Sequence, residues 1–149
     1  MPDEDTIRRA ARDKRQGKSP STQAGEFVRE EIEHVREGKH GARSAKQAIA
    51  IGLSKARRAG VDLPPPKTGT KKTRDGARRA RAAGKSSTKK SPSAKRSRAT
   101  KNALRREGHS AASRKALSRQ ATSAARKRSA SSRSAAARKA ARTRARRSK

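Results

Sequence analysis

The chain has 149 residues, with 44 Lys and Arg against 12 Asp and Glu, no Cys, Tyr or Trp, and a single Phe. The lack of cysteine excludes disulfides, thiolate metal sites and thiol nucleophiles, and no apolar run is long enough to predict a membrane span. High charge combined with few large apolar residues is typical of disorder, so most of the chain is expected to be disordered.

Residues 1–20 form a polar segment of mixed charge that begins "MPDEDTIRRAARDKR". Acidic residues precede basic ones, as the helix dipole favours, but Ile7 is the only large apolar residue. The sequence therefore predicts at most a marginal helix here. The segment also has no hydrophobic stretch of the kind that a secretory signal contains, so we expect an intracellular protein.

Residues 21–62 carry the pattern of a small all-α helical hairpin. The first predicted helix starts near Ser21 or Thr22 and ends before Gly38. The second starts at a Ser-x-x-Gln capping box, residues 44–47, and ends before Gly60. Apolar residues recur at helical steps on the first helix, where Ala24 and Phe27 extend the stripe. One face of the second helix is marked by Ala45, Ala48, Ile49, Gly52, Leu53 and Ala56. The residues expected to form the hairpin core are Val28, Ile32, Val35, Ile49 and Leu53.

A hairpin of this size has only a small hydrophobic core. Modules of two short helices usually need dimerisation, a metal or disulfides to persist, and here no disulfide can form. Two interpretations remain open: a homodimer that pairs through the hairpin, and a weakly stable hairpin that becomes ordered on its target.

Charge and hydropathy both change at "LPPPK", residues 63–67. Residues 1–66 hold 14 basic and 10 acidic residues, whereas residues 67–149 hold 30 basic residues and only two acids, Asp75 and Glu107. Three successive prolines stop a helix. The sequence therefore predicts a proline linker at 63–66 and a disordered Lys/Arg/Ala/Ser-rich tail at 67–149, with 110–128 as the part best able to become helical on a polyanion.

The string "KQAIAIGLSKAR", residues 46–57, is the part of the chain that carries a resemblance to a known family. Residues 19–66 resemble a family of small bacterial proteins of unknown function that is marked by such a string. The resemblance implies a bacterial source and no activity, substrate or catalytic residue. The tail is similar, in composition alone, to the basic tails of histone H1-like bacterial proteins.

The expected partner of the tail is nucleic acid, with DNA favoured over RNA. Arg outnumbers Lys there, which favours bidentate contacts with phosphate, and the tail has no aromatic residue to stack on bases. Phosphate contacts alone give salt-sensitive binding without sequence preference. The residues expected to bind are Arg57, Arg58, Lys71, Lys72, Arg78, Arg79, Arg81, Lys89, Lys90, Lys95, Arg96, Arg98, Arg105, Arg106, Arg114, Lys115, Arg126, Lys127, Arg128, Arg138, Lys139, Arg142, Arg144, Arg146 and Arg147.

These features predict a histone-like, nucleoid-associated protein of the cytoplasm that neutralises phosphates and bridges or condenses DNA. Two other functions stay open. The tail could bind RNA, as in a ribosome-associated protein, or it could only localise an adaptor whose first helix docks another protein through its acidic face.

Catalysis and metal binding are not expected. His34 and His40 lie near Glu37, but two histidines six residues apart match no established ligand spacing, so both are interpreted as solvated. Glu30 and Glu31 are expected on an outer helix face, where nothing would perturb them. The sequence thus predicts no enzyme, no metal site and no cofactor.

Overall fold

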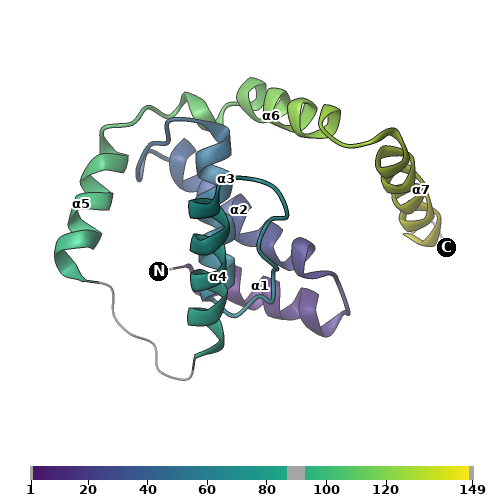
Figure 1. Ribbon diagram of the computed structural model, residues 1–149, viewed down its shortest axis with the longest axis horizontal. Helices are drawn as coiled ribbons and strands as arrows, with labels where there is room; N and C mark the ends of the chain where they lie inside the picture. Colours follow the sequence, from purple (N-terminus) through teal and green to yellow (C-terminus); the bar gives the residue numbers. More distant parts are fainter. Residues whose placement is uncertain (1, 87–92, 148–149) are drawn as a thin grey trace. The chain divides into compact units, whose positions relative to one another are not determined.

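The structure is a computed structural model that describes residues 2–86 and 93–147, with the side chain of Arg147 left out. Within these ranges the chain forms seven α-helices and one 3₁₀ turn, η1, and no strand (Figure 1). It divides into two compact units, residues 1–113 and 114–149. The elements are α1 (Glu4–Arg15), α2 (Pro20–Arg36), α3 (Ala45–Arg58), α4 (Lys71–Lys85), α5 (Ala94–Arg105), η1 (Ser110–Ala112), α6 (Arg114–Arg126) and α7 (Ala130–Arg147).

The prediction of a mostly disordered chain with a disordered tail is wrong. Four helices, α4 to α7, lie between residues 71 and 147. Their composition explains this, because Ala, Arg and Lys have among the highest intrinsic helix propensities and a helix satisfies its backbone hydrogen bonds without a core. The sequence argument counted missing apolar burial and gave too little weight to propensity.

The predicted all-α hairpin corresponds to α2 and α3. The Ser19 hydroxyl caps α2 by accepting from Thr22 N at 3.4 Å, with Pro20 at the first helical position. Ser44 caps α3 by accepting from Gln47 N at 3.2 Å, as predicted. The Gln47 side chain reaches back one residue further than in a standard capping box and accepts from Arg43 N at 2.8 Å.

Small residues form the contact between α2 and α3. The buried face of α3 consists of Ala45, Ala48, Gly52 and Ala56. A Cβ on Gly52 would lie 2.7 Å from Val28 Cα, so the two backbones approach each other directly there. This close approach fixes the spacing of the hairpin.

The hairpin core therefore differs in composition from the expected set of large aliphatics. Val35 is fully buried, whereas Val28, Ile32, Ile49 and Leu53 are half-buried beside the small residues. Two apolar clusters lie at opposite ends of the hairpin. One contains Ala10, Ala24, Phe27, Ala56 and Val61, and the other contains Val35, Ala42, Ala48, Ala111 and Ala112.

Helix α1 packs on α2 as a full element of the first unit. Ala10 joins the cluster around Phe27, and Thr6 and Asp13 are also buried. The Asp13 carboxylate accepts from Lys18 Nζ at 2.6 Å, which ties the end of α1 to the turn before α2. The segment that was expected to form at most a marginal helix is thus a packed helix of the bundle, beside α2 and α3.

The proline segment is held against the bundle. Leu63 packs on the cluster around Phe27, and the carbonyls of Leu63 and Pro64 accept from the Arg57 guanidinium at 3.2 and 3.0 Å. The boundary between compact units falls later, between Ser113 and Arg114. Within the described ranges, no helix combines the length and the hydropathy that crossing a membrane would need.

The turn η1 closes the opposite end of the hairpin. Ala111 and Ala112 are buried against α2 and α3, and the Ala112 carbonyl accepts from Arg36 Nε at 3.0 Å. Two backbone hydrogen bonds also join the loop after α2 to this segment: Gly41 N to the Leu104 carbonyl, at 2.9 Å, and Ala42 N to the Gly108 carbonyl, at 3.0 Å. Residues 104–112 therefore belong to the same body as the hairpin.

Candidate nucleic-acid interface

Helix α4 is seated on α3 through small residues. Ala77 and Ala80 are buried, and a Cβ on Gly84 would lie 1.9 Å from the Arg57 carbonyl oxygen. Because the contact face contains no cation, the basic side chains of α4 point elsewhere. Those that are exposed are Lys71, Lys72, Arg78, Arg79 and Lys85, while Arg74 and Arg81 are half-buried.

An ion-pair group fixes the C-terminal part of α4 to the loop after α3. Asp62 Oδ1 lies 2.7 Å from the Arg81 guanidinium and 3.2 Å from Lys85 Nζ. Hydrogen bonds from Arg81 and Lys85 lower the pKa of Asp62 from 3.8 to about 2. Arg81, one of the residues expected to bind phosphate, thus already has an anionic partner.

Asp62 provides a test of this seating. Its lowered pKa means that its favourable pairing is complete above about pH 4 and is lost as the pH falls toward 2. An NMR titration of the Asp62 carboxyl carbon should give a midpoint of about 2, and Arg81→Gln should move that midpoint up toward 3.8. Arg79→Gln, which removes an exposed cation from the same helix, should leave it in place. A midpoint near 3.8 in the parent protein would contradict the pairing.

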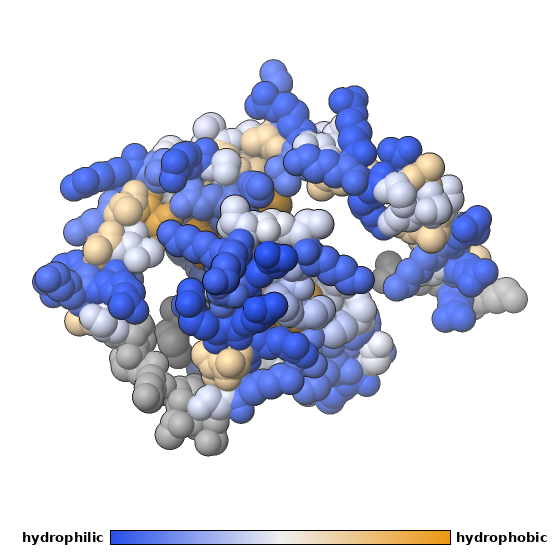
Figure 2. All heavy atoms as spheres, viewed as in Figure 1, coloured by the Kyte–Doolittle hydropathy of each residue, from blue (hydrophilic) through white to orange (hydrophobic). Residues whose placement is uncertain are grey.

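Helix α5 displays cations and buries no side chain. Its five basic residues, Lys95, Arg96, Arg98, Lys101 and Arg105, are all exposed, and Arg106 follows them. Lys101 is absent from the set expected from the sequence, although it has the same exposure as the others. Figure 2 shows hydrophilic side chains covering most of the face in view, with small apolar patches between them.

The second unit, α6 and α7, has an almost entirely exposed surface. Leu117 is only half-buried, and every basic residue of the unit whose side chain is described is exposed. These residues are Arg114, Lys115, Arg119, Arg126, Lys127, Arg128, Arg133, Arg138, Lys139, Arg142, Arg144 and Arg146. Arg119 and Arg133 were missing from the expected set. Arg128 also donates to Ser132 Oγ, at 3.0 Å, at the start of α7.

The basic residues of α7 lie on all sides of the helix rather than on one stripe. Successive residues are about 100° apart around a helix, so Arg138, Lys139, Arg142 and Arg144 point in four different directions. Ala residues fill the positions between them. A helix of this kind can meet anions on more than one side at once.

Arg57 is not available to a nucleic acid. Only 7% of it is exposed, its guanidinium donates to three backbone carbonyls, and burial lowers its pKa. Its neighbour Arg58 is exposed. The expected residues Lys89 and Lys90, together with the side chain of Arg147, lie outside the described residues.

The bundle that carries α4 includes the string that produced the resemblance noted in the sequence. Residues 4–68 match the model of a family of unknown function, DUF6496. This match confirms the resemblance to a family of unknown function and extends it back over α1. The matched region, residues 4–68, ends before α4, so the basic helices from α4 onward lie outside it. No curated protein and no solved structure matches the chain.

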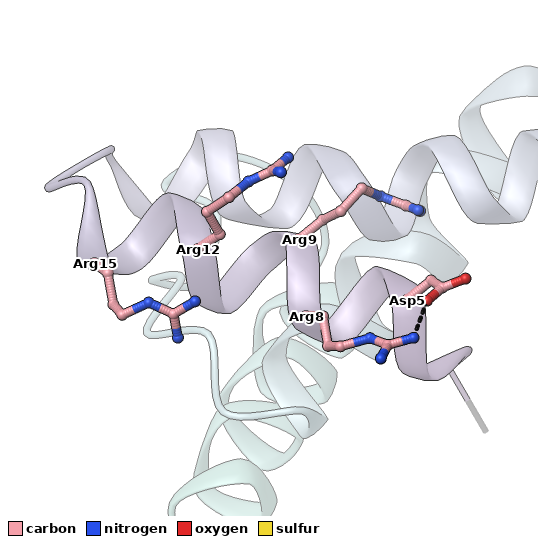
Figure 3. A pocket seen from close by; sticks show the side chains of 5 residues that line it. All are labelled: Asp5, Arg8, Arg9, Arg12 and Arg15. Atoms are coloured by element: carbon pink, nitrogen blue, oxygen red, sulfur yellow. Dashed lines mark hydrogen bonds and ion pairs between the residues drawn. The ribbon is translucent and has the colours of Figure 1, made fainter.

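The matched region carries a row of arginines that the sequence reasoning missed. Arg8, Arg12 and Arg15 follow one another along α1 at steps of four and three residues and line a shallow hollow together with Asp5 and Arg9 (Figure 3). Arg8 pairs with Asp5. Among the described residues, Arg12 and Arg15 have no acidic partner. Their helical spacing was the signal that could have identified this row.

Arg9 lines the same hollow, but unlike Arg12 and Arg15 it has an acidic partner. It donates to Glu26 Oε2 at 2.8 Å and to Thr6 Oγ1 at 2.9 Å. The contact with Glu26 attaches α1 to α2, whereas Thr6 lies in α1 itself. Arg9 is therefore a structural residue, and Arg12 and Arg15 are the members of the row that remain open to an anion.

The matched region also contains a buried group of ionisable side chains that were expected, from the sequence, to lie on the surface. Glu30 and Glu31 are 3% and 0% exposed, because α1, α3 and the loop after α2 cover the face of α2 that was expected to be solvated. Lys55 Nζ lies 3.1 Å from Glu30 Oε1 and 2.7 Å from Glu31 Oε2. Burial acts to lower the pKa of Lys55, but the two carboxylates outweigh it and raise that pKa above its usual value.

The two histidines belong to this same group. Their rings are 6.1 Å apart, and the side chains of His34 and His40 are 13% and 18% exposed. The interpretation of both as solvated residues is therefore wrong. Glu37, which the sequence placed with them, pairs instead with Lys39 at 3.0 Å.

Proposed function

We propose that the protein binds duplex nucleic acid, with DNA as its principal ligand, without sequence preference and through the cations of α4 to α7. The observation that carries the proposal is the charge of residues 67–149, where 30 basic residues accompany two acidic ones. Most of these cations are exposed on helices and few have an acidic partner among the described residues. A surface that served solubility alone would need far less charge.

The chemistry favours phosphate over bases as the point of contact. Guanidinium groups bind phosphate oxygens in pairs, and no aromatic side chain is present in this part of the chain to stack on a base. A helix about 10–12 Å in diameter fits a major groove about 12 Å wide. Cations on all sides of α7 could then contact the phosphates of both groove walls.

Two separate basic units offer a way to bridge DNA within one chain. The first unit carries α4 and α5, and the second carries α6 and α7. Bridging therefore does not need the homodimer that the sequence suggested. The hairpin faces expected to pair between chains are packed within one chain, and Ile7 is the only exposed large hydrophobic residue that the structure describes.

Binding of RNA is the second candidate function, because the same cations would meet its phosphates. The deep, narrow major groove of an RNA duplex does not admit a helix, which favours DNA if α7 enters a groove. An adaptor that docks another protein through the acidic face of α2 has less support, since Glu30 and Glu31 of that face are buried.

Fluorescence anisotropy with two unrelated 30-base-pair DNA duplexes and one RNA duplex tests the proposal. If about ten phosphates are contacted, the slope of log K against log salt should be near −9, and both DNA sequences should bind equally. A shallow slope or a preference above tenfold between the DNA sequences would contradict the proposal. Tenfold tighter binding to RNA would establish the second candidate instead.

A further inference from the structure

The buried ionisable group at the centre of the first unit has the composition of a metal site. Ligand atoms of Glu31, His34 and His40 all lie within 4.8 Å of one another, and a second set, from Asp3, Glu30 and His34, meets the same limit. The residues come from three different places in the chain: the segment before α1, the middle of α2, and the loop that leads to α3. We propose that the first set, Glu31, His34 and His40, binds one divalent transition-metal ion of the zinc class.

The hydrogen bond of His40 decides which of its nitrogens faces the site. His40 Nδ1 lies 3.0 Å from the Gly41 carbonyl oxygen, which can only accept, so Nδ1 carries the hydrogen. In the neutral ring, Nε2 then has a free lone pair, and it lies 3.3 Å from Glu31 Oε1. Histidines that bind metals commonly donate their other N–H to a backbone carbonyl in this way.

Glu31 is the unsatisfied member of the group. Its side chain is fully buried, and its Oε1 accepts no hydrogen bond from the described residues. Lys55 neutralises Oε2 as an ion pair at 2.7 Å, which leaves Oε1 facing the His40 lone pair. Two electron-rich atoms at that distance need a cation between them. A proton could join one such pair, whereas a metal ion would serve Glu31, His34 and His40 together.

Distances and charge agree with a divalent ion. Two ligands about 2.0–2.1 Å from a tetrahedral zinc ion are about 3.3–3.4 Å apart. The structure has 3.3 Å between Glu31 Oε1 and His40 Nε2, two members of the proposed ligand set. The carboxylates of Glu30 and Glu31 together with the Lys55 ammonium leave a charge of −1 around the ligand set before the metal is added. Imidazole ligands favour zinc-class ions over magnesium or calcium.

A metal here would stabilise the fold rather than catalyse a reaction. It would join α2 to the loop before α3. The core of this unit consists mostly of alanine, and a structural metal is a common substitute for a large core in small domains. This role is independent of nucleic-acid binding.

Calorimetric titration of the untagged full-length protein with Zn²⁺ tests the site. We expect one ion per chain and a rise in melting temperature, with no effect of Mg²⁺ at the same concentration. Co²⁺ should give the visible absorption of a tetrahedral site. His34→Gln and His40→Gln should each lower the Zn²⁺ affinity by more than about tenfold and remove the rise in melting temperature.

His109→Gln is the matched control, since His109 is the one other histidine and is exposed outside the group. It should bind Zn²⁺ like the parent protein. Both test variants change side chains that are partly exposed, so circular dichroism should show the parent helix content in each without metal. The proposal is overturned if the parent shows no saturable binding of one Zn²⁺, or if the two test variants bind it as tightly as His109→Gln.

Discussion

Replacing Arg138, Arg142 and Arg146 of α7 with glutamine is expected to weaken binding to duplex DNA by roughly 100-fold at 0.15 M salt. Each phosphate contact contributes about −0.9 to the slope of log K against log salt, so three lost contacts make the slope shallower by about 2.7. All three arginines are exposed. Fluorescence anisotropy across a salt series measures both quantities.

The same triple substitution should make α7 more helical. A loss of DNA affinity can then be attributed to the lost charge and not to a loss of helix. The three arginines follow one another at i and i+4, where like charges repel and cost about 0.2–0.5 kcal/mol per pair. Glutamine keeps a good helix propensity and removes the repulsion. Circular dichroism should therefore show unchanged or greater helicity in a variant that binds DNA more weakly.

A control with the same number of new glutamines is available on the same helix. Ala137, Ala140 and Ala141 are exposed, and their replacement by glutamine leaves the charge unchanged. This variant should keep both the affinity and the salt slope of the parent. Parent-like affinity in the arginine variant would show that α7 is not part of the interface.

Local signals in the sequence were sufficient to predict the hairpin. Ser44 caps α3 as expected, and Gly38 and Gly60, with φ of 75° and 94°, follow the two helices as left-handed terminal residues. Each of these features depends on a few neighbouring residues. A pattern that acts over one turn of helix can be recognised without knowledge of the fold.

Which side chains of the predicted inner face are buried could not be predicted in the same way. Ile49 and Leu53 were expected there beside Gly52 and the alanines, yet only Gly52 and the alanines are buried at the helix contact. Glycine and alanine signal nothing about burial by themselves, because their small size matters only when another backbone lies opposite. The distance of closest approach depends on how the two helices pack together, so it cannot be predicted from the sequence of either helix alone.

The clustering of Glu31, His34 and His40 could not be predicted from the sequence for a related reason. On an isolated hairpin, Glu31 would pair with Lys55 of α3 but would stay open to solvent on its other side. Helix α1 and the loop before α3 bring Asp3 and His40 to the same side of α2, and this arrangement buries Glu31. A mixed-charge segment with one isoleucine gave no reason to expect that packing.

Gly52→Ala is expected to destabilise the first unit by about 1–3 kcal/mol, although alanine is the better helix former. The new Cβ would lie 2.7 Å from Val28 Cα and 2.9 Å from the Phe27 carbonyl oxygen. Both are backbone atoms, so α2 and α3 must move apart, and the apolar clusters at both ends of the hairpin would loosen. Urea unfolding followed by circular dichroism measures the loss.

Gly25→Ala supplies the matched comparison, since it makes the same chemical change in the interior of α2. No atom lies within 4 Å of a Cβ at Gly25, so only the gain in helix propensity remains. That variant should be more stable than the parent by about 0.5–1 kcal/mol. The two glycines thus predict shifts of opposite sign from one substitution. If Gly52→Ala were stabilising as well, α2 and α3 would not be in backbone contact at Val28, and the small-residue packing of the hairpin would have to be abandoned.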